Sequence, residues 1–191
     1  MMRSTGQTIV LAYAALGGVT LAMTALLGDP LTGLFGPRPW DDAAADVALG
    51  VTFGLTVVAV SQRAARWSTA MSRMSDGLGE VVRGFLRPRD VFAQACASAL
   101  AEELFFRGFL QPRFGLIATA VVFGLAHATQ DRRLWFWPAL SVLFGLAFGW
   151  LFEARGSLIA PAVAHFVINY FNLHHLLALE PQGLHDGPRP A

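Results

Sequence analysis

Residues 101–108 read Ala-Glu-Glu-Leu-Phe-Phe-Arg-Gly. This stretch lies inside an otherwise apolar segment, which runs from about Val91 to Leu110. Glu102, Glu103 and Arg107 therefore fall where a helix embedded in lipid normally carries no charge. On insertion scales, each such charge costs about 2.5 to 3.5 kcal/mol at the centre of a bilayer. A chain tolerates this cost when the charges pair, face a polar interior or take part in chemistry.

The composition indicates a polytopic membrane protein. Of the 191 residues, 54% are hydrophobic and only 14% are charged, whereas a soluble domain carries about 25% charged residues. The formal net charge is +1, and no basic run alternates with aromatic residues, so nucleic acid is not an expected partner. The single cysteine, Cys96, excludes an intrachain disulfide and a cysteine metal cluster.

Long apolar runs predict the membrane spans, because about 20 helical residues cross a hydrocarbon core of ~30 Å. The first run is longer than the apolar core of a cleavable signal peptide, so we expect a retained helix. A Pro- and Gly-rich loop is expected over Asp29–Asp46. We expect about six transmembrane helices, at Gln7–Leu27, Val47–Val60, Val91–Leu110, Leu116–Thr129, Leu134–Phe152 and Ser157–Leu179.

The segment Ser61–Asp90 differs from the spans on either side because it carries six arginines. Its apolar residues recur at spacings of three and four, which predicts one apolar stripe on a helix. The stripe comprises Trp67, Met71, Met74, Leu78, Val81 and Phe85. Such a helix between two spans is typical of one that lies on the membrane surface.

The expected fold is therefore all-α, a polytopic membrane helical bundle of about six transmembrane helices plus one interfacial amphipathic helix. It forms a single membrane-embedded domain over residues 1–180, with residues 181–191 as a polar, disordered tail. Arginine placement predicts the orientation. With the N-terminus in the cytoplasm, ten arginines lie inside and three (Arg38, Arg113 and Arg155) lie outside. Both termini are thus expected to be cytoplasmic.

The charged stretch divides into two parts. Glu103 and Arg107 are four residues apart on a helix, with the acid before the base, and this order favours an ion pair. Glu102 is rotated away by about 100° and remains free to react. The alternative is that both acids only bind Arg107 and hold helices together.

Two other spans carry polar pairs, Phe123 with His127 and His165 with Asn169. Taken alone, each has a structural explanation, as a hydrogen-bonded residue or as interhelical glue. Counted from the outer helix ends, however, Glu102, His127 and His165 lie about 13, 16 and 12 Å deep. An acid and two imidazoles at one level can activate water to attack a carbonyl, directly or through a metal. Other polar or aromatic residues are expected to be interfacial, lipid-facing or packing groups: Asn172, His174, His175, Phe144, Phe148 and Trp150.

Three motifs, in this order, resemble the signatures of the CPBP family, which comprises CAAX prenyl proteases and bacteriocin-processing enzymes and is also called the Abi family. The resemblance covers about half of the chain, the expected catalytic core at residues 91–179. It implies an intramembrane endopeptidase that hydrolyses a peptide bond of a membrane-anchored protein or peptide near the bilayer. The motifs are Glu102-Glu103-x-x-x-Arg107, Phe123-x-x-x-His127 and His165-x-x-x-Asn169.

By this resemblance, Glu102 is the catalytic base and His127 helps it to activate water. His165 and Asn169 stabilise the oxyanion, and Glu103 with Arg107 supports the site. A metal remains an alternative, because Glu102, His127 and His165 are also a three-ligand zinc set with an open fourth position. The lack of a His-Glu-x-x-His motif favours a mechanism without a cofactor.

The substrate is left open, since larger relatives commonly have eight spans. Some bacterial relatives resemble C-terminal maturation or sorting peptidases, and others are linked to bacteriocin immunity. The expected location is a bacterial inner membrane, with membrane lipids as partners, and the oligomeric state is not predicted. One competing hypothesis is a non-catalytic bacteriocin-immunity or scaffold membrane protein. Another is a proton or ion carrier, which the lack of inverted repeats disfavours.

Overall fold

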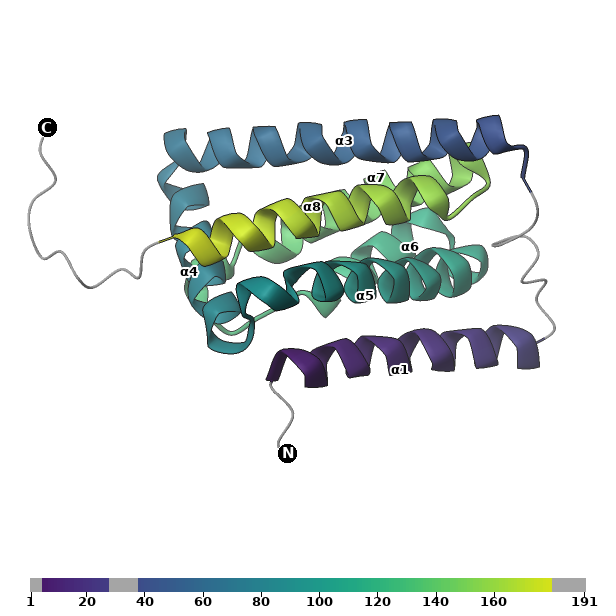
Figure 1. Ribbon diagram of the computed structural model, residues 1–191, viewed down its shortest axis with the longest axis horizontal. Helices are drawn as coiled ribbons and strands as arrows, with labels where there is room; N and C mark the ends of the chain where they lie inside the picture. Colours follow the sequence, from purple (N-terminus) through teal and green to yellow (C-terminus); the bar gives the residue numbers. More distant parts are fainter. Residues whose placement is uncertain (1–4, 28–37, 180–191) are drawn as a thin grey trace, which may run out of the picture.

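The structure, a computed structural model, describes residues 5–27 and 38–179. Within these ranges the chain is all-α (Figure 1), which confirms the predicted class. The predicted tail at residues 181–191 lies outside the described residues. Two 3-10 turns, η1 (Pro88–Asp90) and η3 (Arg132–Leu134), and a π-helix, η2 (Leu104–Leu110), accompany the α-helices. The α-helices are α1 (Thr5–Leu26), α3 (Trp40–Trp67), α4 (Thr69–Phe85), α5 (Val91–Glu103), α6 (Gln111–Ala126), α7 (Trp137–Arg155) and α8 (Ile159–Ala178).

The long helices lie side by side, and α4 crosses one end of the bundle (Figure 1). From top to bottom of Figure 1, α3 packs on α8, α8 on α5 and α5 on α1. Helices α6 and α7 pack on each other behind this row. The arrangement places α8 between α3 and α5, in the middle of the bundle.

Glycines set the close approach of α3 to α8. A Cβ atom at Gly50 would lie 2.6 Å from the carbonyl oxygen of Ala160, and one at Gly54 would lie 2.8 Å from the side chain of Val167. Two small residues four positions apart are a common device for packing membrane helices backbone to backbone. They hold α8, which carries part of the candidate site, against α3.

Four segments are suited by length and composition to cross a membrane, and they indicate an integral membrane protein. They are Gly6–Leu26, Trp40–Trp67, Pro88–Ala126 and Arg132–Arg155. The third segment reverses at Gly115, where φ is 79°, a conformation that favours glycine. The Phe123 ring then packs 4.9 Å from the Phe106 ring. The sixth predicted span corresponds to α8, which is not among these four segments of the described residues.

The predicted loop at Asp29–Asp46 is wrong in its second half, because α3 already begins at Trp40; residues 28–37 lie outside the described residues. Two aspartates in the first turn of α3 suit the positive end of the helix dipole. The third, Asp46, is fully buried and is bound by Arg155 and Arg38. Asp46 is thus paired within the protein, and Asp42 lies 3.8 Å from Arg155.

The predicted amphipathic helix is present as α4, with a different buried face. Ser68 is extended and accepts the backbone N–H of Met71, so it ends α3 and caps α4. The predicted stripe is wrong in part, because Trp67 belongs to α3 and is 85% exposed, and Val81 is 50% exposed. The buried residues of α4 are Met74, Gly77, Gly79 and Val82.

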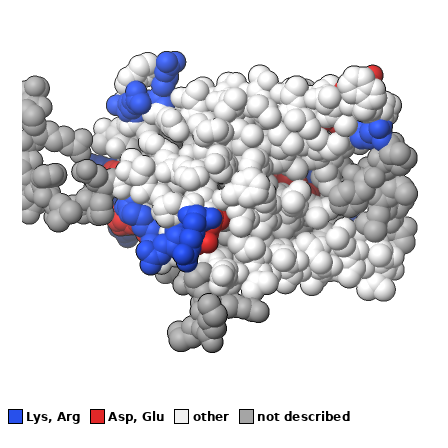
Figure 2. Space-filling model, in the orientation of Figure 1, with Lys and Arg blue, Asp and Glu red and all other residues white. Residues whose placement is uncertain are grey.

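On the face shown in Figure 2, charged side chains gather mainly at the α4 end, a few lie at the opposite end, and the surface between is largely uncharged. At the α4 end, Arg133 pairs with Glu80 and Asp131, each at 2.8 Å. Its hydrogen bonds hold the pKa values of both carboxyl groups below their ordinary range. Arg83 donates to the carbonyl oxygens of Leu176 and Leu179 at the end of α8.

The start of α1 also lies at the α4 end, where Gly6 is against Asp90. Since Arg83 binds the end of α8 there, the first and last described helices begin and end on the same side of the bundle.

Candidate active site

The structure brings Glu102, His127 and His165 together from three helical segments. Glu102 lies on α5, His127 directly follows α6 and His165 lies on α8. The Nε2 atom of each histidine is 3.9 Å from the Oε2 atom of Glu102. Glu102 is 7% exposed and His165 is 5% exposed. Glu102, His127 and His165, which the sequence predicted to lie at similar depths, are therefore close together.

Glu103 and Arg107 form the ion pair that their spacing predicts. The Arg107 Nη1 atom is 3.1 Å from Glu103 Oε1, and both side chains are buried. The pairing persists although residues 104–110 are π-helical, a geometry often found at functional sites. Arg107 also donates to the carbonyl oxygen of Gly145 at 3.0 Å and lies 4.7 Å from the Phe123 ring centroid.

Glu103 has a second partner that the sequence did not indicate. Its Oε1 atom lies 2.8 Å from Nδ1 of His165. A carboxylate only accepts hydrogen bonds, so Nδ1 donates and Nε2 is left to face Glu102. The Phe148 ring stacks on the His165 imidazole, with centroids 5.1 Å apart. Glu103 thus neutralises Arg107 and also orients His165, and Phe148 packs against the site.

His127 lies at the end of α6, not within a helix that continues to Thr129 as predicted. Its Nδ1 atom is 2.8 Å from the carbonyl oxygen of Phe123. That oxygen can only accept, so Nδ1 carries the hydrogen and Nε2 again faces Glu102. The helix end therefore fixes the orientation of the imidazole.

Asn169 lies one turn beyond His165 on α8 and is held by Ser98 of α5. Its Nδ2 atom donates to Ser98 Oγ at 3.0 Å, and Ser98 Oγ donates to the Ala95 carbonyl oxygen at 3.3 Å. The sequence analysis did not identify Ser98. The available signal was its position four residues before Glu102 on the same helix.

Tyr13 is a further contact of Glu102 that the sequence analysis missed. Its side chain hydrogen-bonds to Glu102 from α1. Helix α1 packs closely on α5 here, since Gly17, one turn beyond Tyr13, lies against Ala101. The signal in the sequence was a single phenol within an otherwise aliphatic span.

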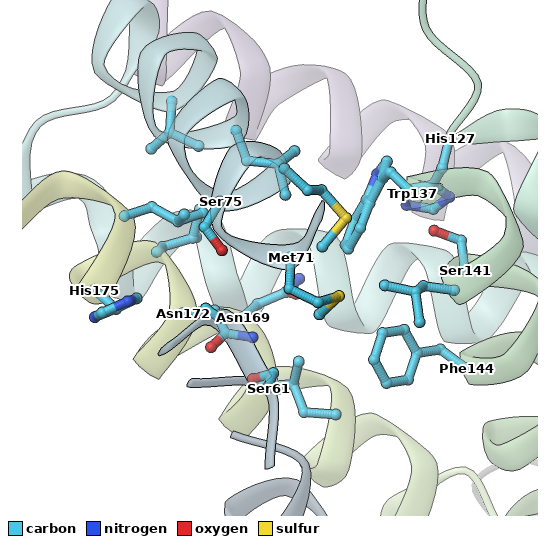
Figure 3. A pocket seen from close by; sticks show the side chains of 18 of the residues that line it. Ser61, Met71, Ser75, His127, Trp137, Ser141, Phe144, Asn169, Asn172 and His175 are labelled. Atoms are coloured by element: carbon cyan, nitrogen blue, oxygen red, sulfur yellow. The ribbon is translucent and has the colours of Figure 1, made fainter. Parts of the chain in front are cut away.

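A cavity of about 210 Å³ reaches the site from the α4 end of the bundle (Figure 3). Its walls are mostly apolar side chains of α4, α7 and α8, such as Met71 and Phe144. His127, His165 and Asn169 line it, and Glu102 does not. On the side of the cavity away from His127, Asn172 and His175 line it (Figure 3), and for these two residues the sequence predicted no function.

The alternative zinc set does not fit this arrangement as it stands. Within residues 5–27 and 38–179, no three His, Cys, Asp or Glu side chains are placed to hold a metal ion together. Both imidazoles do present Nε2 towards Glu102, but at 3.9 Å each.

Comparisons with known proteins agree with the motifs. Residues 86–171 match the model of a family described as type II CAAX prenyl endopeptidase Rce1-like. The chain is 27% identical over 126 residues to an uncharacterized protein of Bacillus subtilis, YpbD, and the match covers 63% of each chain. The chain thus spans less than two thirds of that curated relative. No solved structure matches it.

Proposed function

Since residues 86–171 form a domain of the Rce1-like type II CAAX prenyl endopeptidase family, we propose that the chain is an intramembrane endopeptidase. It hydrolyses a peptide bond of a membrane-associated protein or peptide near the bilayer. One observation carries the proposal: Nε2 of His127 and Nε2 of His165 both lie 3.9 Å from Oε2 of Glu102. These separations are too long for direct hydrogen bonds and suit a bridging water.

Glu102 and His127 hold and activate that water. One water hydrogen is accepted by Glu102 Oε2 and the other by the unprotonated Nε2 of His127, so the oxygen lone pair can face a substrate carbonyl carbon. As the oxygen attacks, Glu102 takes the proton. It then gives this proton to the leaving amine when the C–N bond breaks.

His165 and Asn169 stabilise the negative oxygen that forms on the attacked carbonyl. Asn169 donates from its amide. His165 donates to the same oxygen when its Nε2 carries a hydrogen, and the Glu103 carboxylate at Nδ1 holds the ring in place. Preorganised donors of this kind are often the largest contribution to catalysis. Arg107 balances the charge of Glu103 and fixes it between α5 and α7.

The lining of the cavity suits a substrate that has an apolar segment. Its walls carry Met71, Met74, Leu78 and Phe144 and are mostly apolar, and the polar lining outside the site includes Ser61, Ser75 and Asn172. An anchored peptide can insert such a segment along α4 towards His127. A C-terminal maturation or sorting peptidase has substrates of this kind.

In the proposed topology the chain crosses the membrane about six times, α4 lies on the cytoplasmic surface and both termini are cytoplasmic. Cysteine labelling tests it in a Cys96→Ser background. In a bacterial inner membrane, Val81→Cys is expected to react with an impermeant maleimide only after the membrane is opened. Trp40→Cys, at the opposite end and 83% exposed, is expected to react from the outside. The reverse pattern contradicts this orientation.

The activity itself is tested in liposomes. Purified protein is reconstituted with membrane-anchored candidate peptides, and the products are identified by mass spectrometry with and without a chelator. We expect a new carboxyl terminus close to the anchor and equal rates in both conditions. Loss of cleavage on chelation with rescue by zinc contradicts the metal-free mechanism. Binding without cleavage for every native candidate favours the non-catalytic immunity or scaffold function.

Replacing Tyr13 with phenylalanine is expected to lower kcat about five- to tenfold, because a hydrogen bond to a charged group contributes more than one between neutral groups. KM should change little, since Tyr13 does not line the cavity. The matched control is Tyr170→Phe on α8, whose side chain packs against Phe92 and Phe166. Equal kcat values for the two variants contradict a role for Tyr13 at Glu102.

A further inference from the structure

Two polar contacts join α5 to α8 at the level of the site. His165 binds Glu103 at 2.8 Å, and Asn169, one turn further along α8, binds Ser98 at 3.0 Å. The helices run in opposite directions, so the later residue of α8 meets the earlier residue of α5. Each of the two proposed oxyanion donors therefore has its own partner on the helix that carries Glu102.

The Ser98 contact fixes which end of the Asn169 amide faces α5. A serine hydroxyl has one hydrogen to donate, and Ser98 directs it to the carbonyl oxygen of Ala95. Its oxygen is then an acceptor for Asn169, which must present its NH2 group and not its oxygen. Ser98 is 3% exposed, so water cannot readily replace this contact.

We propose that Ser98 is a positioning residue that sets the amide of Asn169 for oxyanion stabilisation. This inference rests on the proposed peptidase function. One N–H of the Asn169 amide is used by Ser98, and the second is held on the cavity side, where Asn169 is a lining residue and Ser98 is not. Without Ser98 the amide can turn over and present its oxygen to the negatively charged intermediate, which is repulsive.

The position of Ser98 also relates the two halves of the site. Ser98 and Glu102 are four residues apart on α5 and therefore share a face. The helix that carries the base thus also sets the amide that receives the developing charge. A small movement of α5 relative to α8 changes both together.

The first test is Ser98→Ala in the reconstituted cleavage assay. We expect kcat to fall about five- to tenfold, in line with the loss of one hydrogen bond, and KM to stay within about twofold. The control is Thr119→Val, which removes another buried hydroxyl. Thr119 is 2% exposed, its hydroxyl has no hydrogen-bond partner among the described residues, and it does not line the cavity. The control should retain kcat.

A double-mutant cycle with Asn169→Ala separates positioning from a general effect on packing. In the Asn169→Ala background, Ser98→Ala is expected to lower kcat by less than about twofold, because no amide is left to orient. Full multiplication of the two single losses overturns the inference, as does a Ser98→Ala variant with the kcat of wild type. If wild type itself does not cleave, or if Glu102→Gln still cleaves, the proposed function fails and this inference fails with it.

Discussion

Glu102→Gln is expected to lower the rate of peptide cleavage about 10²- to 10⁴-fold, the range that general-base catalysis supplies. Glutamine has nearly the same shape as glutamate and can still hydrogen-bond to Tyr13, but it cannot take a proton from water. The loss should therefore fall on kcat, with substrate binding largely kept. Single-turnover cleavage of a membrane-anchored peptide in liposomes measures it.

The control for this variant is Glu80→Gln, which makes the same chemical change on α4. Glu80 pairs with Arg133 at the surface, away from the histidines, and its variant should cleave at the wild-type rate. Thermal unfolding of both variants shows whether either one is misfolded. A folded Glu102→Gln protein that cleaves like wild type contradicts the assignment of the base.

Glu103→Ala is expected to destabilise the fold by about 3–5 kcal/mol, the usual cost of breaking a buried ion pair from one side. The change leaves the Arg107 guanidinium buried, and of its two hydrogen bonds within the described residues it keeps the one to the carbonyl oxygen of Gly145. It also frees Nδ1 of His165, so any folded protein should have lost most of its activity. Thermal unfolding in detergent, followed by the liposome assay, measures the two effects separately.

Two further variants serve as comparisons for the unfolding temperature of Glu103→Ala. Arg133→Ala removes ion pairs at the exposed α4 end, where solvent screens charges, and should shift the unfolding temperature far less. Glu103→Gln keeps a hydrogen-bond acceptor for one of the two partners and should lie between Glu103→Ala and wild type. An unfolding temperature for Glu103→Ala that equals that of Arg133→Ala contradicts a structural role for the buried network.

Much of the site was predictable because its signals are local. The spacing of Glu103 and Arg107 fixes their pairing on any helix, and the polar residues of α8 are conspicuous in an apolar span. Local reasoning failed where a polar residue has a distant partner. Asp46 was assigned to a Pro- and Gly-rich loop, yet it lies in α3 and binds Arg155, 109 positions away.

The helical membrane class and the residue types of the site were predictable from the amino acids, since hydrophobicity and i,i+4 spacing act within one segment. Which of these residues meet depends on how the helices pack. The contacts of His165 with Glu103 and of Asn169 with Ser98 join positions 62 and 71 residues apart. They depend on the register of α5 against α8, which the packing of α3, α8 and α5 sets. No spacing within a single helix encodes that register.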